Sequence, residues 1–186
     1  MGNRVLIVDD DPSLCAAMAR VAGAWGDEVL TAHSVAQALS LLETNPTLLI
    51  VDVCLPDGRA MDVVEAASRR RPVPTMIAMS GAASPEESFG LAQAGVRAFL
   101  SKPIAVSDLR AKVEAALHQP PALEPLVVGS VGHTPLRRVQ SEVRRAMVDQ
   151  ALARAGGNRS EAARLLQVTR QAVQQMVHER EEQSSA

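Results

Sequence analysis

Five short apolar runs recur between residues 4 and 101, and each is followed by a stretch with helical spacing of its apolar residues. Short apolar runs bounded by turn residues are typical of strands buried on both faces of a parallel sheet. We expect strands at residues 4–8, 28–32, 48–51, 75–79 and 98–101. We expect the helices at residues 12–25, 34–43, 61–70, 84–94 and 106–118. This alternation predicts an α/β fold with a doubly wound parallel sheet.

A segment with repeated proline and glycine follows the last of these helices. Pro120, Pro121 and Pro125 disfavour a helix, so we interpret residues 119–135 as a linker. The resulting division of the chain is a first domain at residues 1–118, the linker at 119–135, a second domain at 136–178 and a polar tail at 179–186.

The second domain has the pattern of a small all-α helix-turn-helix. Its long first helix begins near Leu136 and is broken at Gly156-Gly157. Shorter helices are expected at residues 161–166 and 170–178, joined by a tight turn of about three residues. We expect Asn158 or Ser160 to cap the first of them and Thr169 to cap the second. Two valines are expected to pack inward, namely Val168 and Val173.

Polar side chains follow four of the five predicted strands. Asp9 and Asp10 follow the first strand, Asp52 the third, Ser80 the fourth and Lys102 the fifth. Carboxyl ends of parallel strands meet at one sheet edge, where such folds place their ligand sites, so we expect these groups together. Clustered carboxylates raise one another's pKa, and a hard divalent cation such as Mg²⁺ relieves their repulsion. A carboxylate nucleophile beside a metal, a hydroxyl and an ammonium suits phosphoryl transfer.

This constellation resembles the receiver domain of two-component response regulators over roughly residues 4–118. The residues that carry the resemblance occur in the family's order and at nearly its spacing, and they are Asp9, Asp10, Asp52, Ser80, Phe99, Lys102 and Pro103. The resemblance implies a flavodoxin-like (βα)5 fold with strand order 2-1-3-4-5. Periodicity alone does not determine that order.

The same resemblance implies the roles of the acidic residues. A histidine kinase would transfer a phosphoryl group to Asp52. Asp10, Asp52 and the backbone carbonyl of Cys54 would bind Mg²⁺ directly, and Asp9 would bind it through a water.

The resemblance also implies a switch. Ser80 would move toward the phosphoryl group, Lys102 would stabilise its charge, and Phe99 would turn inward behind Ser80. Pro103 would shape the loop beyond Lys102 through a cis peptide bond.

One position departs from the family pattern. Receivers usually have glycine eight residues after the acceptor, and this chain has Ala60 there. We expect the nearby Gly58 to supply the flexibility of this loop instead.

The second domain resembles the Fis-type DNA-binding domain over about residues 136–178, at Gly157-Asn158, at the Ala-Ala-Arg-Leu-Leu run and at Arg170. The resemblance implies a homodimer formed by the long first helix, with the last helix in the major groove of double-stranded DNA. The residues expected to face DNA are Thr169, Arg170, Gln171 and Gln174, with Arg159 and Arg164 near phosphates.

The expected recognition helix is poorly basic for this family. Arg170 is its single strongly basic residue before Arg180. Fewer phosphate contacts predict weaker nonspecific binding and a shallower dependence on salt.

Composition and charge agree with two different domains. The chain of 186 residues is 47% hydrophobic and 22% charged, which is typical of a globular protein. Residues 1–118 hold 10 Lys/Arg against 14 Asp/Glu, whereas residues 133–178 hold 8 Arg against 3 acids, so we expect only the second domain to meet a polyanion. With no apolar run near ~20 residues and no signal-like N-terminus, we expect a cytoplasmic protein without a membrane partner. Cys15 and Cys54 match no metal spacing and are interpreted as reduced thiols.

The leading hypothesis is a transcriptional regulator controlled by phosphorylation of Asp52. The alternative is a signalling adaptor whose C-terminal helices dimerise or bind a protein instead of DNA. A third hypothesis, an enzyme that uses Asp52 on phosphate esters, is disfavoured because Cys54 stands where the common aspartyl phosphatases would have a second acid. We therefore expect a phosphoacceptor that assists its own phosphorylation and slow dephosphorylation, without independent substrate turnover.

Overall fold

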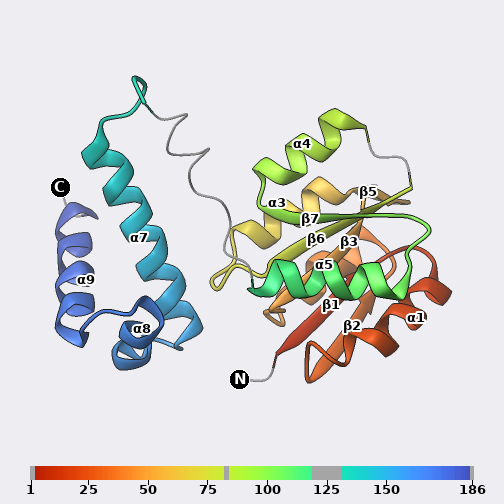
Figure 1. Ribbon diagram of the computed structural model, residues 1–186, viewed down its shortest axis with the longest axis horizontal. Helices are drawn as coiled ribbons and strands as arrows, with labels where there is room; N and C mark the ends of the chain where they lie inside the picture. Colours follow the sequence, from red (N-terminus) through yellow and green to blue (C-terminus); the bar gives the residue numbers. More distant parts are fainter. Residues whose placement is uncertain (1–2, 82–83, 119–130, 185–186) are drawn as a thin grey trace. The chain divides into compact units, whose positions relative to one another are not determined.

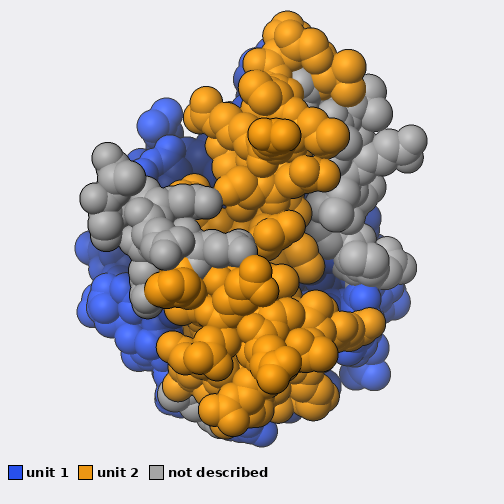
Figure 2. Space-filling view, turned by 90° about the vertical axis from the view of Figure 1, so that its left-hand side faces the viewer, with its two compact units in different colours: residues 1–121 blue, residues 122–186 orange. Residues whose placement is uncertain are grey.

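The computed structural model describes residues 3–81, 84–118 and 131–184 (Figure 1). The chain divides into two compact units, residues 1–121 and 122–186, which Figure 2 colours separately. Most of the predicted linker, residues 119–130, lies outside the described residues.

The first unit is built on a five-stranded parallel sheet with the order β2-β1-β3-β6-β7. Since β4 and β5 form a separate hairpin, this is the predicted 2-1-3-4-5 order of the flavodoxin-like fold, and the predicted fold class is confirmed. The strands are β1 (Arg4–Val8), β2 (Glu28–Ala32), β3 (Leu48–Asp52), β6 (Thr75–Ser80) and β7 (Val96–Ser101).

Helices cover both faces of the sheet (Figure 1). Helices α1 (Pro12–Ala22) and α5 (Val106–His118) pack on one face. Helices α2 (Val35–Leu42), α3 (Ala60–Ser68) and α4 (Pro85–Gln93) pack on the other. Strand residues alternate between the two cores: Leu48 and Ile50 of β3 face the α1–α5 side, while Leu49 and Val51 face the α2–α3–α4 side. The interior positions of the central strands are therefore apolar on both faces, as burial on both sides requires.

Side-chain caps set several helix starts where the sequence predicts them. Asp11 accepts hydrogen bonds from the amides of Ser13 and Leu14 at 2.8 and 3.3 Å. Ser84 and Glu87 form a reciprocal capping box at the start of α4. Helix α1 ends at Ala22, three residues earlier than expected, and Trp25 beyond it donates its indole N–H to Glu114 on α5.

The loop after Asp52 is a short antiparallel hairpin of β4 (Cys54–Leu55) and β5 (Gly58–Arg59). Gly58 lies within β5 and does not adopt a positive φ. Ala60 is the first residue of α3 and is buried.

The second unit contains α7 (Leu136–Arg154), α8 (Arg159–Leu166) and α9 (Arg170–Ser184). Its small core includes Ala151, Ala162, Ala163 and Val173. Alanines allow the helices to approach closely, and the arrangement confirms the predicted helix-turn-helix.

The turns of the second unit use the predicted chain breakers. Gly156 and Gly157 adopt φ of 58° and 83°, a left-handed backbone that glycine reaches without a Cβ clash. The Asn158 side chain accepts from the Ser160 and Glu161 amides, so Asn158 is the cap of α8 and Ser160 lies inside the helix. The Thr169 hydroxyl accepts from the Ala172 amide and caps α9, as expected.

Two expectations for the second unit are wrong. Helix α9 does not end at His178 but continues to Ser184, through most of the predicted polar tail. The added residues contain no Gly or Pro and are mostly good helix formers, so nothing in them stops the helix. Val168 is 38% exposed, because it lies in the turn between α8 and α9, whereas Val173 is fully buried as predicted.

Candidate phosphoacceptor site and nucleic-acid interface

Three carboxylates meet at the carboxyl edge of the sheet. Strand β3 ends at Asp52, and Asp9 and Asp10 follow β1, whose Val8 pairs with Val51 of β3. One carboxylate oxygen from each lies within 4.8 Å of the others. Asp9 and Asp52 are almost completely buried, whereas Asp10 is exposed. The parallel register thus places together the three acidic residues that the sequence analysis singled out.

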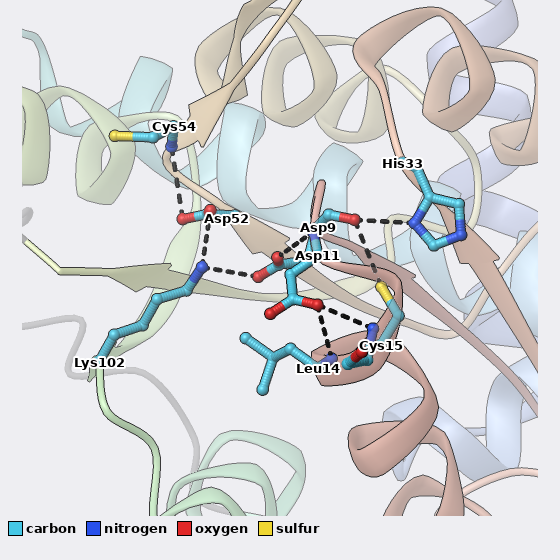
Figure 3. Close-up of polar contacts among 9 residues, drawn as sticks. Asp9, Asp11, Leu14, Cys15, His33, Asp52, Cys54 and Lys102 are labelled. Carbon is cyan, nitrogen blue, oxygen red and sulfur yellow. Dashed lines mark hydrogen bonds and ion pairs between the residues drawn. The ribbon is translucent and has the colours of Figure 1, made fainter.

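The Lys102 ammonium forms ion pairs with the two buried carboxylates. Its Nζ lies 2.7 Å from Asp9 Oδ2 and 2.8 Å from Asp52 Oδ2 (Figure 3). Partial burial acts to lower the pKa of Lys102, but the hydrogen bond and charge of Asp52, together with those of Asp9, outweigh it and raise that pKa above its ordinary value. Lys102 is therefore a cation at neutral pH.

The cluster is suited to a hard divalent cation. The buried Asp9 Oδ2 faces the Lys102 ammonium and has no other hydrogen-bond donor among the described residues. It is joined by further carboxylate oxygens from Asp10 and Asp52, and carboxylates are the ligands that Mg²⁺ prefers. The residues present therefore fit Mg²⁺.

The main chain of Asp9 is held by two side chains that the sequence did not single out. His33 Nδ1 lies 2.9 Å from the Asp9 carbonyl oxygen, and the Cys15 thiol donates to the same oxygen at 3.4 Å (Figure 3). Burial and the charge of Asp9 raise the pKa of Cys15 to about 11, so this thiol stays protonated at neutral pH. Neither contact has a sequence signal, because each depends on how the α1 and α2 ends are placed against β1.

Ser80 lies on β6, the strand next to β3, whereas Phe99 lies on β7 at the edge of the sheet and Pro103 follows β7. Ser80 is nearly buried at the end of β6, one residue past Met79, which pairs with Asp52 of β3. Phe99 on β7 is half-buried and packs against the core on the α2–α3–α4 side. The Lys102–Pro103 peptide bond is cis. A second cis bond, Arg71–Pro72, was not expected from the sequence.

The residues expected to contact DNA are all exposed on the second unit. They are Arg159, Arg164, Thr169, Arg170, Gln171 and Gln174. Gln171 and Gln174 line a shallow depression on α9 with Gln175 and His178.

Two of these residues already have local partners. Arg164 binds Glu161 through two contacts of 2.6 and 3.0 Å, which raises the pKa of Arg164 and lowers that of Glu161. The Thr169 hydroxyl is engaged in the cap of α9. Arg164 would therefore have to share its guanidinium between Glu161 and a DNA phosphate.

The second unit also exposes apolar side chains on and near α7. Leu136, Val143 and Met147 are 69%, 41% and 54% exposed, and Leu165 and Val168 at the end of α8 are 42% and 38% exposed. In the parts of the chain that the structure describes, no helix is both long and apolar enough to cross a membrane.

A sheet of this order with three carboxylates and a lysine at its carboxyl edge defines a receiver-type domain. A family model described as "Response regulator receiver domain" matches residues 5–114, and one described as "Bacterial regulatory protein, Fis family" matches residues 140–175. The chain belongs to the response regulator receiver family and carries a Fis-family helix-turn-helix domain after its receiver.

Individual relatives match the receiver, and one of them matches along nearly the whole chain. The acid tolerance regulatory protein ActR of Rhizobium meliloti (strain 1021) is 29% identical over 182 residues, covering 95% of this chain and 86% of ActR. The transcriptional regulatory protein CpxR of Escherichia coli (strain K12) is 29% identical over 117 residues, covering 63% of this chain, so the chain spans about half the length of CpxR. A CheY-like receiver domain protein from Methanospirillum hungatei JF-1 superposes with a TM-score of 0.57 at 32% identity, covering 62% of this chain and 93% of that structure.

Proposed function

We propose that Asp52 accepts a phosphoryl group from a histidine kinase and that this modification controls transcription through DNA binding by α8 and α9. The observation that carries the proposal is the cluster of Asp9, Asp10, Asp52 and Lys102 at the sheet edge, in a chain whose second unit is a helix-turn-helix. The family membership and the transcriptional relative CpxR support the same reading.

In the transfer step a carboxylate oxygen of Asp52 attacks the phosphorus of a phosphohistidine on the kinase. A P–O bond forms as the P–N bond breaks, and the imidazole nitrogen leaves with the bonding pair and takes up a proton. Bound Mg²⁺ would neutralise charge on the phosphoryl oxygens. Asp10, Asp52 and the Cys54 carbonyl would hold the ion directly, and Asp9 would hold it through a water.

Lys102 and Ser80 would respond to the new group. The Lys102 ammonium, which pairs with Asp52 Oδ2 at 2.8 Å, would move to a phosphoryl oxygen, and the Ser80 hydroxyl would donate to another. Movement of Ser80 would leave space behind it into which Phe99 could turn, and this would change the surface of β7 and its neighbouring helix. Slow loss of the phosphoryl group to water, without turnover of other substrates, would reset the switch.

The output would be a dimer on DNA. The exposed apolar side chains of α7 suit pairing of two copies, and α9 would enter the major groove with Arg170, Gln171 and Gln174 toward the bases. Arginine side chains hydrogen-bond guanine and glutamine side chains hydrogen-bond adenine in the major groove, so we expect a DNA site that contains both G·C and A·T base pairs.

The second candidate is a signalling adaptor whose C-terminal helices bind a protein. The observation that favours it is the low positive charge of α9, together with the engagement of Arg164 by Glu161. The two candidates share the receiver and differ only in what the second unit binds.

Arg170→Ala distinguishes the two candidates. In a regulator it should weaken binding to selected genomic fragments by about 1–3 kcal/mol, or roughly 5- to 150-fold, and relax the preference at one base position. The measurement is competition binding on fragments enriched by the parent protein. Arg137→Ala, which removes another exposed arginine of the second unit, should leave base preference unchanged. DNA affinity equal to that of the parent, with loss of a protein partner, would favour the adaptor.

A further inference from the structure

The β4–β5 hairpin joins the acceptor to a helix that plays no part in the proposed chemistry. The hairpin begins two residues after Asp52, and its first residue, Cys54, carries the carbonyl proposed as a metal ligand. At its turn, Asp57 Oδ1 accepts from the Val35 amide at 2.7 Å and Asp57 Oδ2 accepts from the Ala36 amide at 3.0 Å. The turn of the hairpin is thus bonded to the first two residues of α2, 22 and 21 positions away in sequence.

Helix α2 therefore has two caps of different origin. Its local cap, Ser34, accepts from the Gln37 amide at 3.1 Å. The two preceding amides are satisfied by Asp57, so the first three N–H groups of the helix all have side-chain acceptors. These backbone hydrogen bonds lower the pKa of Asp57, which keeps its carboxylate ionised beside the positive end of the helix.

The close approach of the hairpin to α2 also depends on the absence of a side chain at Gly58. A Cβ atom placed on Gly58 would lie 3.2 Å from Val35 Cγ2, so only a residue without a side chain lets the hairpin approach α2 this closely without displacing Val35. On the other side, the Arg59 amide donates to Asp62 Oδ2 of α3 at 3.3 Å. The hairpin is held between the starts of two helices.

The tether at Asp57 is connected to Asp52 through the two residue pairs of the β4–β5 hairpin. Leu55 pairs with Gly58 and Cys54 with Arg59, so the turn and the start of the hairpin are coupled. The Cys54 amide in turn donates to Asp52 Oδ1 at 3.4 Å.

We infer that Asp57 is a positioning residue of the phosphoacceptor site, which fixes the Cys54 carbonyl for Mg²⁺ by tethering the hairpin to α2. The inference rests on the proposed function, because it assumes that Mg²⁺ and Asp52 act as described there.

The test compares two variants that uncap the same helix. Asp57→Ala removes the two capping bonds that tether the hairpin to α2. Ser34→Ala removes one capping bond of the same helix and leaves that tether in place. Mg²⁺ affinity of the full chain is measured by titration calorimetry, and amide hydrogen exchange is followed for α2 and the hairpin. Both variants should speed exchange at the first turn of α2. Only Asp57→Ala should speed exchange in the hairpin and weaken Mg²⁺ binding about tenfold, the lower end of the effect of losing a residue that orients a metal ligand.

Asp57→Asn provides the conservative comparison. It keeps an acceptor oxygen for one α2 amide, so it should recover part of the Mg²⁺ affinity lost in Asp57→Ala, and it serves as the reporter if Asp57→Ala does not fold. Asp57 variants that bind Mg²⁺ as tightly as Ser34→Ala would overturn the inference, provided that the parent binds Mg²⁺ and is phosphorylated. A parent that binds no Mg²⁺ and accepts no phosphoryl group would overturn the proposed function itself.

Discussion

Asp52→Asn is expected to abolish phosphorylation of this protein. Asp52 supplies the nucleophilic oxygen, is almost completely buried, and shares the sheet edge with Asp9, Asp10 and Lys102. An amide has no carboxylate oxygen to attack phosphorus, so incorporation from a small-molecule acyl phosphate with Mg²⁺ should fall below detection. The measurement is intact-protein mass spectrometry over time.

Asp11→Asn is the matched control for that result. Asp11 lies beside the cluster but caps α1 through its side-chain oxygen, and asparagine caps helices equally well. This variant should incorporate a phosphoryl group as the parent does. Incorporation by Asp52→Asn to the same stoichiometry as the parent would show that the acceptor is another residue.

Lys102→Met is expected to destabilise the first unit as well as slow phosphorylation. Its ammonium is the cation that pairs with both buried carboxylates, at 2.7 and 2.8 Å. Removing one partner of a buried ion pair leaves uncompensated charge, so the free energy of unfolding should drop by about 3 kcal/mol without Mg²⁺. Added Mg²⁺ should restore part of this loss, because a divalent cation neutralises the same oxygens.

The control and the pH dependence make this prediction specific. The chain has only one other lysine, Lys112 on the exposed side of α5, and Lys112→Met should change stability little.

The pKa of Lys102 is higher in the folded than in the unfolded chain. The contribution of Lys102 to the free energy of unfolding is therefore fully present below the ordinary lysine pKa of about 10.4. It is lost as the pH rises through the pKa that Lys102 has in the folded chain. Denaturant unfolding at neutral and alkaline pH measures this, and equal stabilities of parent and Lys102→Met at neutral pH would contradict it.

The sheet and most of the site could be predicted from the sequence because their signals are local. Each strand is an apolar run, and Asp9, Asp52 and Lys102 follow strand ends. A parallel sheet brings such ends to one edge whatever the intervening helices contain. The helix starts at Asp11 and Ser84 were likewise predictable, since a cap bonds amides two or three residues away.

The remaining features depend on contacts between distant segments. Asp57 reads in sequence as an ordinary turn residue, and only the packing of the hairpin against α2 shows that it caps that helix. The contacts of His33 and Cys15 with the Asp9 carbonyl have the same origin. The prediction that Val168 is buried failed for a related reason, because its exposure depends on how closely α8 and α9 approach at the turn. The family resemblance correctly indicated the strand order, which periodicity left open.

The decisive measurement for a phosphorylation-controlled regulator is binding of the full chain to a pool of fragmented genomic DNA, with and without an acyl phosphate and Mg²⁺. The parent should enrich a defined set of fragments, lose them as salt is raised, and shift its affinity for them when the phosphodonor is added. Asp52→Ala should bind the same fragments without that shift. Identical binding by the parent in both states, with Asp52 phosphorylated in one of them, would contradict control of DNA binding by phosphorylation.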